Sequence, residues 1–196
     1  HSIGEDLHIT PDHLGLVFSV ALAGMMLGAM FIAPVSDMIG RRKMILCCVT
    51  AIGASMYLTG YANQLWQLII LRMMTGLGVG GMLASLAAMT AEYTPEKYRS
   101  LAVMCVTAGY PLGATLGGFI AAPLMQDYGW QSVFFCGGAA TLVMVITIYF
   151  MMPETIQFLI AKRPENALQR INEILIRLNR ETLSELPAID HETPID

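Results

Sequence analysis

Charged residues are scarce in this chain, and their scarcity decides its class. Asp, Glu, Lys and Arg make up 13% of the 196 residues, while hydrophobic residues make up 55% and the mean hydropathy is +0.58. A soluble domain typically carries about 25% charged residues. The charges crowd into the first dozen residues, two short loops and the tail after Pro153. The formal net charge of −4 gives no reason to expect a nucleic-acid partner, and we expect none.

Metal-binding and disulfide patterns are missing too. The four cysteines lie within apolar runs, with no CxxC spacing and no nearby histidine: Cys47, Cys48, Cys105 and Cys136. We therefore predict small packing residues in lipid-buried helices, and neither a metal nor a cofactor.

What the chain does have is five long apolar runs. They cover residues 14–36, 44–62, 65–91, 101–126 and 132–152. Each is close to or above the ~20 residues that a helix needs to cross a hydrocarbon core. A soluble core helix is usually shorter and keeps a polar face. The sequence predicts an all-α integral membrane chain whose five transmembrane helices occupy residues 14–152, with residues 1–13 as a loop and residues 153–196 as a tail.

Basic residues alternate between the loops. Arg41, Arg42 and Lys43 separate the first two runs, Lys97 and Arg99 separate the third from the fourth, and Lys162 and Arg163 follow the fifth. The loops near Asn63 and Asp127 contain no Lys or Arg. The positive-inside rule then makes the loops at 37–43 and 92–99 and the tail cytoplasmic. Residues 1–13 would lie outside, so we expect a further spanning helix before His1.

Small residues recur at helical spacing within the runs. Gly24 and Gly28 form GxxxG, and Gly109, Gly113 and Gly117 form a longer ladder, a spacing that lets helices approach closely in lipid. A second glycine set, Gly76, Gly78 and Gly81, also matches the dinucleotide fingerprint GxGxxG, but no strand precedes it. Close packing, or a helix face that lines a path, is the favoured interpretation. Pro111 removes a backbone hydrogen bond within the fourth run, which predicts a kink.

Arg72 is the only cation within a predicted span. A charge at mid-helix costs roughly 2.5–3.5 kcal/mol on insertion scales, so it normally faces a cavity or a partner. One interpretation is snorkelling, because Leu65 is only about 10 Å away along the axis at ~1.5 Å per residue. The favoured one is a pathway position, where a guanidinium could grip a carboxylate substrate with two hydrogen bonds. Arg72 could equally pair with an acidic side chain on the helix that we expect before His1.

Two carboxylates are expected at the same membrane surface as the basic loops. Asp37 lies four residues before Arg41, and Glu92 and Arg99 flank the turn between the third and fourth runs. Surface ion pairs are worth only about 0–1 kcal/mol, so solvated loop charges are one interpretation. A cluster that forms in one conformation and breaks in another, acting as a latch, is the other.

These segments together resemble the motifs of a known family. Ala33-Pro-Val-Ser-Asp37-Met-Ile-Gly40-Arg41-Arg42-Lys43 resembles the signature loop between helices two and three of the major facilitator superfamily. Its helix-four motif, the motif after it, and its helix-five and helix-six motifs are similar to residues 72–78, 92–99, 109–118 and 129–155. Ala33 stands where the family usually has Gly, and Met38 where it usually has a cation. The order and spacing make the resemblance specific.

The resemblance implies the N-terminal half of that fold: helices two to six without helix one, followed by part of the central cytoplasmic loop. Within this tail, apolar residues that recur near a 3.6-residue period predict an amphipathic helix near residues 165–180. The partners expected are the first helix, the C-terminal six-helix half, the lipid bilayer, a small organic anion and a proton. Within the superfamily the chain is most similar to the aromatic acid:proton symporters. We therefore expect a transporter of the bacterial inner membrane that takes up a small carboxylate or aromatic acid by alternating access.

The resemblance also assigns candidate residues. The substrate or proton pathway would include Arg72, Gly76, Tyr110 and Pro111. Conformational gating would involve the following residues: Asp37, Gly40, Arg41, Arg42, Glu92 and Arg99. A sugar or other metabolite porter, and a non-transporting receptor or scaffold on the same fold, remain alternatives. An enzyme is disfavoured, because the spans offer Arg72 without a His, Asp or Glu partner.

Overall fold

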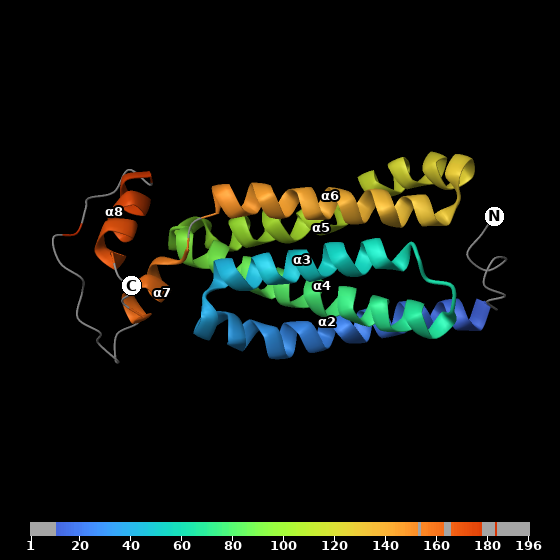
Figure 1. Cartoon of the computed structure of the whole chain (residues 1–196). Coiled ribbons are helices and arrows are strands. Elements are labelled where there is room, and N and C mark those ends of the chain that lie inside the picture. Colours follow the sequence, from blue (N-terminus) through green and yellow to red (C-terminus); the bar gives the residue numbers. More distant parts are fainter. Residues whose placement is uncertain (1–10, 153, 163–165, 178–182, 184–196) are drawn as a thin grey trace. The chain divides into compact units, whose positions relative to one another are not determined.

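The computed structural model describes residues 11–152, 154–162, 166–177 and 183, which are helical with short connections (Figure 1). The chain divides into two compact units, His1–Met151 and Met152–Asp196. The predicted loop before Pro11, and the part of the predicted tail after residue 180 apart from Leu183, lie outside the described residues.

Over residues 11–151 the first unit forms five long helices: α2 (Pro11–Ile39), α3 (Arg41–Thr59), α4 (Leu65–Tyr93), α5 (Glu96–Tyr128) and α6 (Trp130–Met151). In the described part of the chain, four helical segments are long and apolar enough to cross a membrane: Gly15–Ile39, α4, α5 and α6. The second predicted span falls on α3, which has 19 residues and begins with three cations. These cations lower its average hydropathy, so α3 joins the bundle without meeting that criterion.

The helices begin earlier than the apolar runs do. The first membrane span was expected from residue 14, and α2 starts one turn earlier at Pro11, since proline suits the first position of a helix. α5 starts at Glu96, directly after Pro95, where a carboxylate favours the positive end of the helix dipole. We expected the basic cluster Arg41–Lys43 in the loop, and this was wrong: it forms the first turn of α3.

Single glycines make two of the chain reversals. Gly40 separates α2 from α3 with φ 110°, and Gly129 separates α5 from α6 with φ 79°. Positive φ is sterically costly for any residue with a Cβ atom, so glycine allows a one-residue connection. The reversal at Gly40 brings the last turn of α2 beside the first turn of α3.

Reciprocal glycines bring α2 and α4 into backbone contact. A Cβ atom on Gly24 would lie 2.6 Å from the Met73 carbonyl oxygen, and one on Gly28 would overlap the carbonyl of Leu77. From the opposite side, Gly76 faces the Ala21 carbonyl and Gly80 faces the Met25 carbonyl. The predicted GxxxG pair therefore packs against a second small-residue pair on α4. In lipid the hydrophobic effect does not drive helices together, so close van der Waals packing of this kind stabilises the helix pair.

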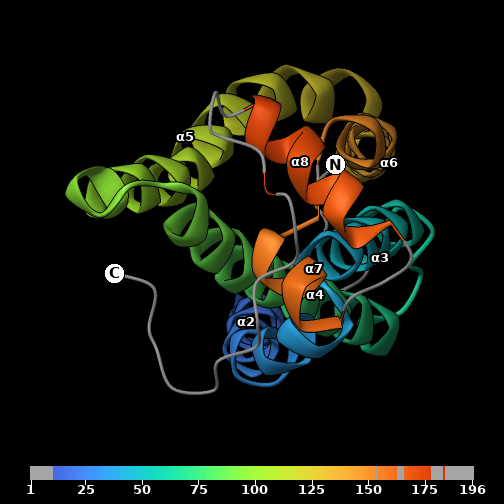
Figure 2. The ribbon, with the colours of Figure 1, turned by 90° about the vertical axis from the view of Figure 1, so that its left-hand side faces the viewer.

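Helix α3 packs between α4 and α6. Gly78 of α4 faces Ile52 of α3, and a Cβ atom built on Gly78 would lie 2.7 Å from Ile52 Cγ1. Gly138 of α6 faces Tyr57 on α3, and a Cβ atom built there would lie 2.6 Å from the Tyr57 backbone nitrogen. Helix α5 touches α4 and α6, but none of its residues is buried by the described chain (Figure 2). Nothing in the described chain lies within 4 Å of a Cβ atom built on Gly109, Gly113 or Gly117. The partner expected for this glycine ladder is therefore not among the described residues.

The described residues of the second unit form two short helices, α7 (Ile156–Lys162) and α8 (Ala167–Arg177), which contact each other. The amphipathic helix expected at residues 165–180 is thus described over Ala167–Arg177. Ile171 and Ile174 of α8 and Leu159 of α7 are buried, while Ile176 is exposed. The side-chain amide of Asn172 donates to the Leu183 carbonyl, and its oxygen accepts from the Leu183 backbone N–H, at 2.9 Å and 2.8 Å.

Candidate functional site

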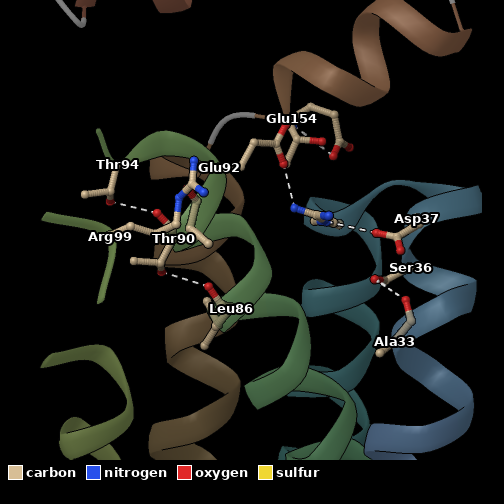
Figure 3. A network of polar contacts seen from close by, with 12 residues as sticks. Ala33, Ser36, Asp37, Leu86, Thr90, Glu92, Thr94, Arg99 and Glu154 are labelled. Atoms are coloured by element: carbon tan, nitrogen blue, oxygen red, sulfur yellow. Dashed lines mark hydrogen bonds and ion pairs between the residues drawn. The ribbon is translucent and has the colours of Figure 1, made fainter. Parts of the chain in front are cut away.

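A charged cluster joins three helices at one end of the bundle (Figure 3). The Arg41 guanidinium on α3 contacts the Asp37 carboxylate on α2, with Nε 3.0 Å from Oδ1. Its Nη1 also lies 2.5 Å from Oε2 of Glu92 on α4. The Asp37 side chain is 60% exposed, whereas the side chains of Arg41 and Glu92 are 15% and 10% exposed. Arg41 therefore makes one ion pair in water and one that is largely shielded from it.

The charges in this cluster oppose the dipoles of their own helices. Asp37 lies in the last turn of α2, where the helix end carries partial negative charge. Arg41, Arg42 and Lys43 lie in the first turn of α3, where the end carries partial positive charge. Each such placement costs about 0.3–1 kcal/mol at an exposed helix end. Contacts with other helices must offset this cost, and Arg41 has two of them.

The other two predicted gating arginines bind backbone carbonyls. Arg42 Nη2 donates to the Tyr149 backbone carbonyl at 2.6 Å. The guanidinium carbon of Arg42 also lies 5.4 Å from the centroid of the Tyr149 ring. Arg99 Nε donates to the Ala91 carbonyl at 3.0 Å. Tyr149 and Ala91 are in the last turns of α6 and α4, where carbonyls lack intrahelical partners and attract cations. These arginines therefore cap helix ends.

Hydroxyl groups near the cluster bind the helix backbone instead of the charges. Ser36 Oγ donates to the Ala33 carbonyl at 2.7 Å, and the Thr90 and Thr94 hydroxyls donate to the Leu86 and Thr90 carbonyls (Figure 3). Among the predicted gating residues, Asp37, Arg41 and Glu92 have side chains joined by ion pairs. Gly40 contributes through its backbone.

Arg72 lies within the bundle on α4, away from the charged cluster in sequence. Its guanidinium carbon is 4.6 Å from the centroid of the Phe134 ring on α6. In the described part of the chain it makes neither an ion pair nor a hydrogen bond, and its side chain is partly buried. A cation–π contact of this kind stabilises the guanidinium without neutralising it. Its N–H donors therefore stay available to an anion.

The remaining predicted pathway residues lie on α4 and α5. Gly76 is buried in the contact between α4 and α2. Tyr110 and Pro111 lie on the exposed part of α5, which continues as a helix through the proline. We find no group of three or more His, Cys, Asp or Glu side chains placed to hold a metal ion among the described residues.

Sequence reasoning missed the aromatic neighbours of Arg72. Phe134 is 9% exposed and packs edge to face on Trp130, whose ring centroid is 5.8 Å away and which is 2% exposed. The residues 129–134 stood out only as a family motif, and nothing in their spacing says which helix faces α4. The signal that the sequence offered was the spacing of Trp130 and Phe134, two aromatic residues one helical turn apart at the start of a predicted membrane helix.

Fold and site together define a class. A bundle of long helices, most of them apolar enough to span a bilayer, carries one cation inside and a charged cluster at one end. These are the features of a multi-pass membrane protein.

Comparison with known proteins makes the class specific. The family model described as Major Facilitator Superfamily matches residues 2–184, so the chain belongs to the major facilitator superfamily. It is 34% identical over 177 residues to the 4-hydroxybenzoate transporter PcaK of Acinetobacter baylyi, which covers 90% of this chain and 38% of that protein. It is 30% identical over 198 residues to the gallate transporter of Pseudomonas putida, covering 98% and 44%. These relatives are transporters, not enzymes, and the predicted resemblance to aromatic acid transporters is confirmed.

Solved structures support the fold. The proton:xylose symporter XylE aligns with a TM-score of 0.67 at 21% identity, covering 83% of this chain and 40% of that one. An inward-open structure of the Escherichia coli xylose transporter XylE aligns with a TM-score of 0.62. This coverage is consistent with the chain forming part of the N-terminal half of a major facilitator fold. The chain spans about two fifths of the length of the curated relatives it matches.

Proposed function

We propose that the full-length protein containing this chain is a proton-coupled secondary transporter that takes up a small aromatic carboxylate by alternating access. Relatives named as transporters of 4-hydroxybenzoate, gallate and benzoate support the substrate class. The protein would lie in a bacterial inner membrane, with the ends of α2 and α4 that carry Asp37 and Glu92 facing the cytoplasm. A preceding helix and a second six-helix half would complete the transport path.

The observation that carries this proposal is the environment of Arg72. A guanidinium held inside a membrane bundle without an acidic partner in the described chain suits a ligand that brings its own negative charge. Its planar set of five donors matches a carboxylate, which it can bind through two parallel hydrogen bonds. An aromatic acid supplies that carboxylate together with an apolar ring that suits the surrounding helices.

The charged cluster would serve the conformational change. Alternating access requires that contacts at one end of the bundle form in one state and break in another. Arg41 links three helices through Asp37 and Glu92, so separating any of these helices would break an ion pair. We assign to this trio the stabilisation of one closed state.

Uptake by the full-length protein in proteoliposomes tests the proposal. With an alkaline interior, electroneutral symport of one proton with each monoanion accumulates substrate about tenfold per pH unit, since 1.4 kcal/mol corresponds to a factor of ten. Benzoic acids also cross lipid passively when protonated, so protein-free liposomes set the baseline. 4-Hydroxybenzoate, benzoate and gallate should enter faster than this baseline at early times, xylose should not, and a protonophore should abolish the difference. Equal initial rates of entry with and without protein would refute the proposal.

Arg72 variants test the carrying observation. Arg72→Ala should abolish the protein-dependent uptake while the protein still inserts and purifies as a single species. Arg72→Lys should retain only part of it, because an ammonium group is a point charge that lacks the planar fork of a guanidinium. Full uptake by Arg72→Ala would remove Arg72 from the pathway.

A further inference from the structure

Two helices that both pack against α3 are bridged by one side chain. Arg72 extends from α4 and places its guanidinium carbon 4.6 Å from the Phe134 ring centroid on α6. This separation is within the ~6 Å at which an aromatic face attracts a cation. The contact therefore fixes the end of a long side chain that would otherwise have several rotamers to explore.

The ring under Arg72 is itself held in place. Phe134 is 9% exposed, and the Trp130 ring meets it edge to face at 5.8 Å with an interplanar angle of 75°. Trp130 is among the most buried large side chains of the described chain and lies one turn before Phe134 on α6. A rigid ring makes a better support for a cation than a mobile one, because less side-chain entropy is lost on contact.

The nature of this support decides what Arg72 can do. A carboxylate in the place of Phe134 would neutralise the guanidinium and occupy its donors. An aromatic ring attracts the cation through its quadrupole and carries no net charge. Arg72 is thus localised while its charge and its N–H groups remain available.

We propose that Phe134 is a positioning residue that holds the Arg72 guanidinium ready for the carboxylate of the transported acid, with Trp130 bracing the ring. This inference rests on the proposed function and adds a residue of α6 to it. Phe134 acts through Arg72, so an aromatic face at this position matters more than apolar volume. The consequence is a substrate affinity that depends on the chemical type of residue 134.

Substitutions in the full-length protein separate these properties. Phe134→Leu removes the aromatic face and keeps an apolar side chain, whereas Phe134→Tyr keeps the face. Phe150→Leu is the matched control, because it makes the same change on the same helix at a side chain that is 78% exposed. Phe134→Met is made alongside as a flexible apolar replacement that fills the space if leucine impairs folding.

The readout is the KM for protein-dependent uptake of 4-hydroxybenzoate. Cation–π contacts are worth about 0.5–2 kcal/mol, so Phe134→Leu and Phe134→Met should raise KM about 2- to 30-fold. Phe134→Tyr and Phe150→Leu should stay within about twofold of the wild type on the same scale. A wild-type KM in both Leu and Met variants, or a Tyr variant as impaired as they are, would overturn the inference while the proposed function stands. Absence of uptake by the wild type would instead overturn both.

A thermal double-mutant cycle adds a test that does not depend on transport. Arg72→Gln, Phe134→Leu and the double variant are compared by melting temperature in detergent. If the two side chains act together, Phe134→Leu should lower the melting temperature less in the Arg72→Gln background than in the wild type. Additive shifts would show that Phe134 only fills space, and the positioning role would be rejected.

Discussion

The close contact between α2 and α4 predicts a strong difference between two glycines of the same helix. A Cβ atom on Gly28 would overlap the Leu77 carbonyl on α4, and two further backbone atoms of Leu77 would lie 2.8 Å and 2.9 Å away. Nothing in the described chain lies within 4 Å of a Cβ atom on Gly15. Because the obstacle at Gly28 is backbone, no rotamer change can relieve it, and the two helices must separate.

The magnitude follows from two terms. Replacing a helical glycine with alanine favours the helix by about 1 kcal/mol, and this gain is common to Gly28→Ala and Gly15→Ala. Overpacking a tight contact costs about 1–3 kcal/mol, and only Gly28→Ala incurs it. The difference between the variants is therefore about 1–3 kcal/mol, which corresponds to roughly 2–12 °C in melting temperature at 2–4 °C per kcal/mol for a unit of this size.

The assay is thermal melting of the purified protein in detergent, followed by loss of the monodisperse species. Gly28→Ala should melt below the wild type or near it, and Gly15→Ala at or above it. Gly80→Ala, which approaches the Met25 carbonyl from α4, should behave like Gly28→Ala. Equal melting temperatures for Gly28→Ala and Gly15→Ala would show that α2 and α4 do not meet through these glycines, and the reasoning would fail.

Three predictions concern the charged end of the bundle. Glu92→Gln removes the shielded partner of Arg41 and should slow uptake more than Asp37→Asn does. The reason is that a shielded ion pair costs about 3–5 kcal/mol to break, whereas an exposed pair contributes about 0–1 kcal/mol. A larger effect on turnover from Asp37→Asn would contradict this order. Arg42→Met removes the donor to Tyr149 and should lower the melting temperature with KM unchanged, whereas a raised KM with unchanged stability would argue against a helix cap. Exchanging the charges in Asp37→Arg/Arg41→Asp matches both helix dipoles but places an acid beside the shielded Glu92 carboxylate, so it should lower stability and slow turnover; wild-type uptake by this double variant would exclude a gating role.

The helices were predictable from the sequence to a useful degree. Long apolar runs require helices in lipid, since only a helix or a closed barrel satisfies the backbone there. The ends were less predictable, because hydropathy reports where the hydrocarbon stops and not where the helix does. Arg41 shows this: its charge suggested a loop, while the positive φ of Gly40 confines the reversal to one residue.

The candidate site could likewise be predicted from the sequence only in part. Arg72 could be found from the sequence because a lone cation in an apolar run demands an explanation. Its contact with Phe134 could not, since it depends on which helices share α3 as a neighbour. Arg42 and Arg99 belong to the same basic loops as Arg41 and Lys97, so sequence alone gave them one shared role. Their hydrogen bonds to terminal carbonyls separate them from the ion pairs of Arg41.

Helix stability alone does not account for the charges around Gly40. An acid at the end of α2 and cations at the start of α3 each have the sign that the local dipole disfavours. The pair between Arg41 and Asp37 joins neighbouring turns and is largely exposed, so it offsets little of this cost. The shielded contact with Glu92 is the one that can offset it, and that contact exists only while α3 and α4 stay together at this end. The charged cluster is therefore more stable when α3 and α4 are together at this end than when they are apart, as the proposed latch requires.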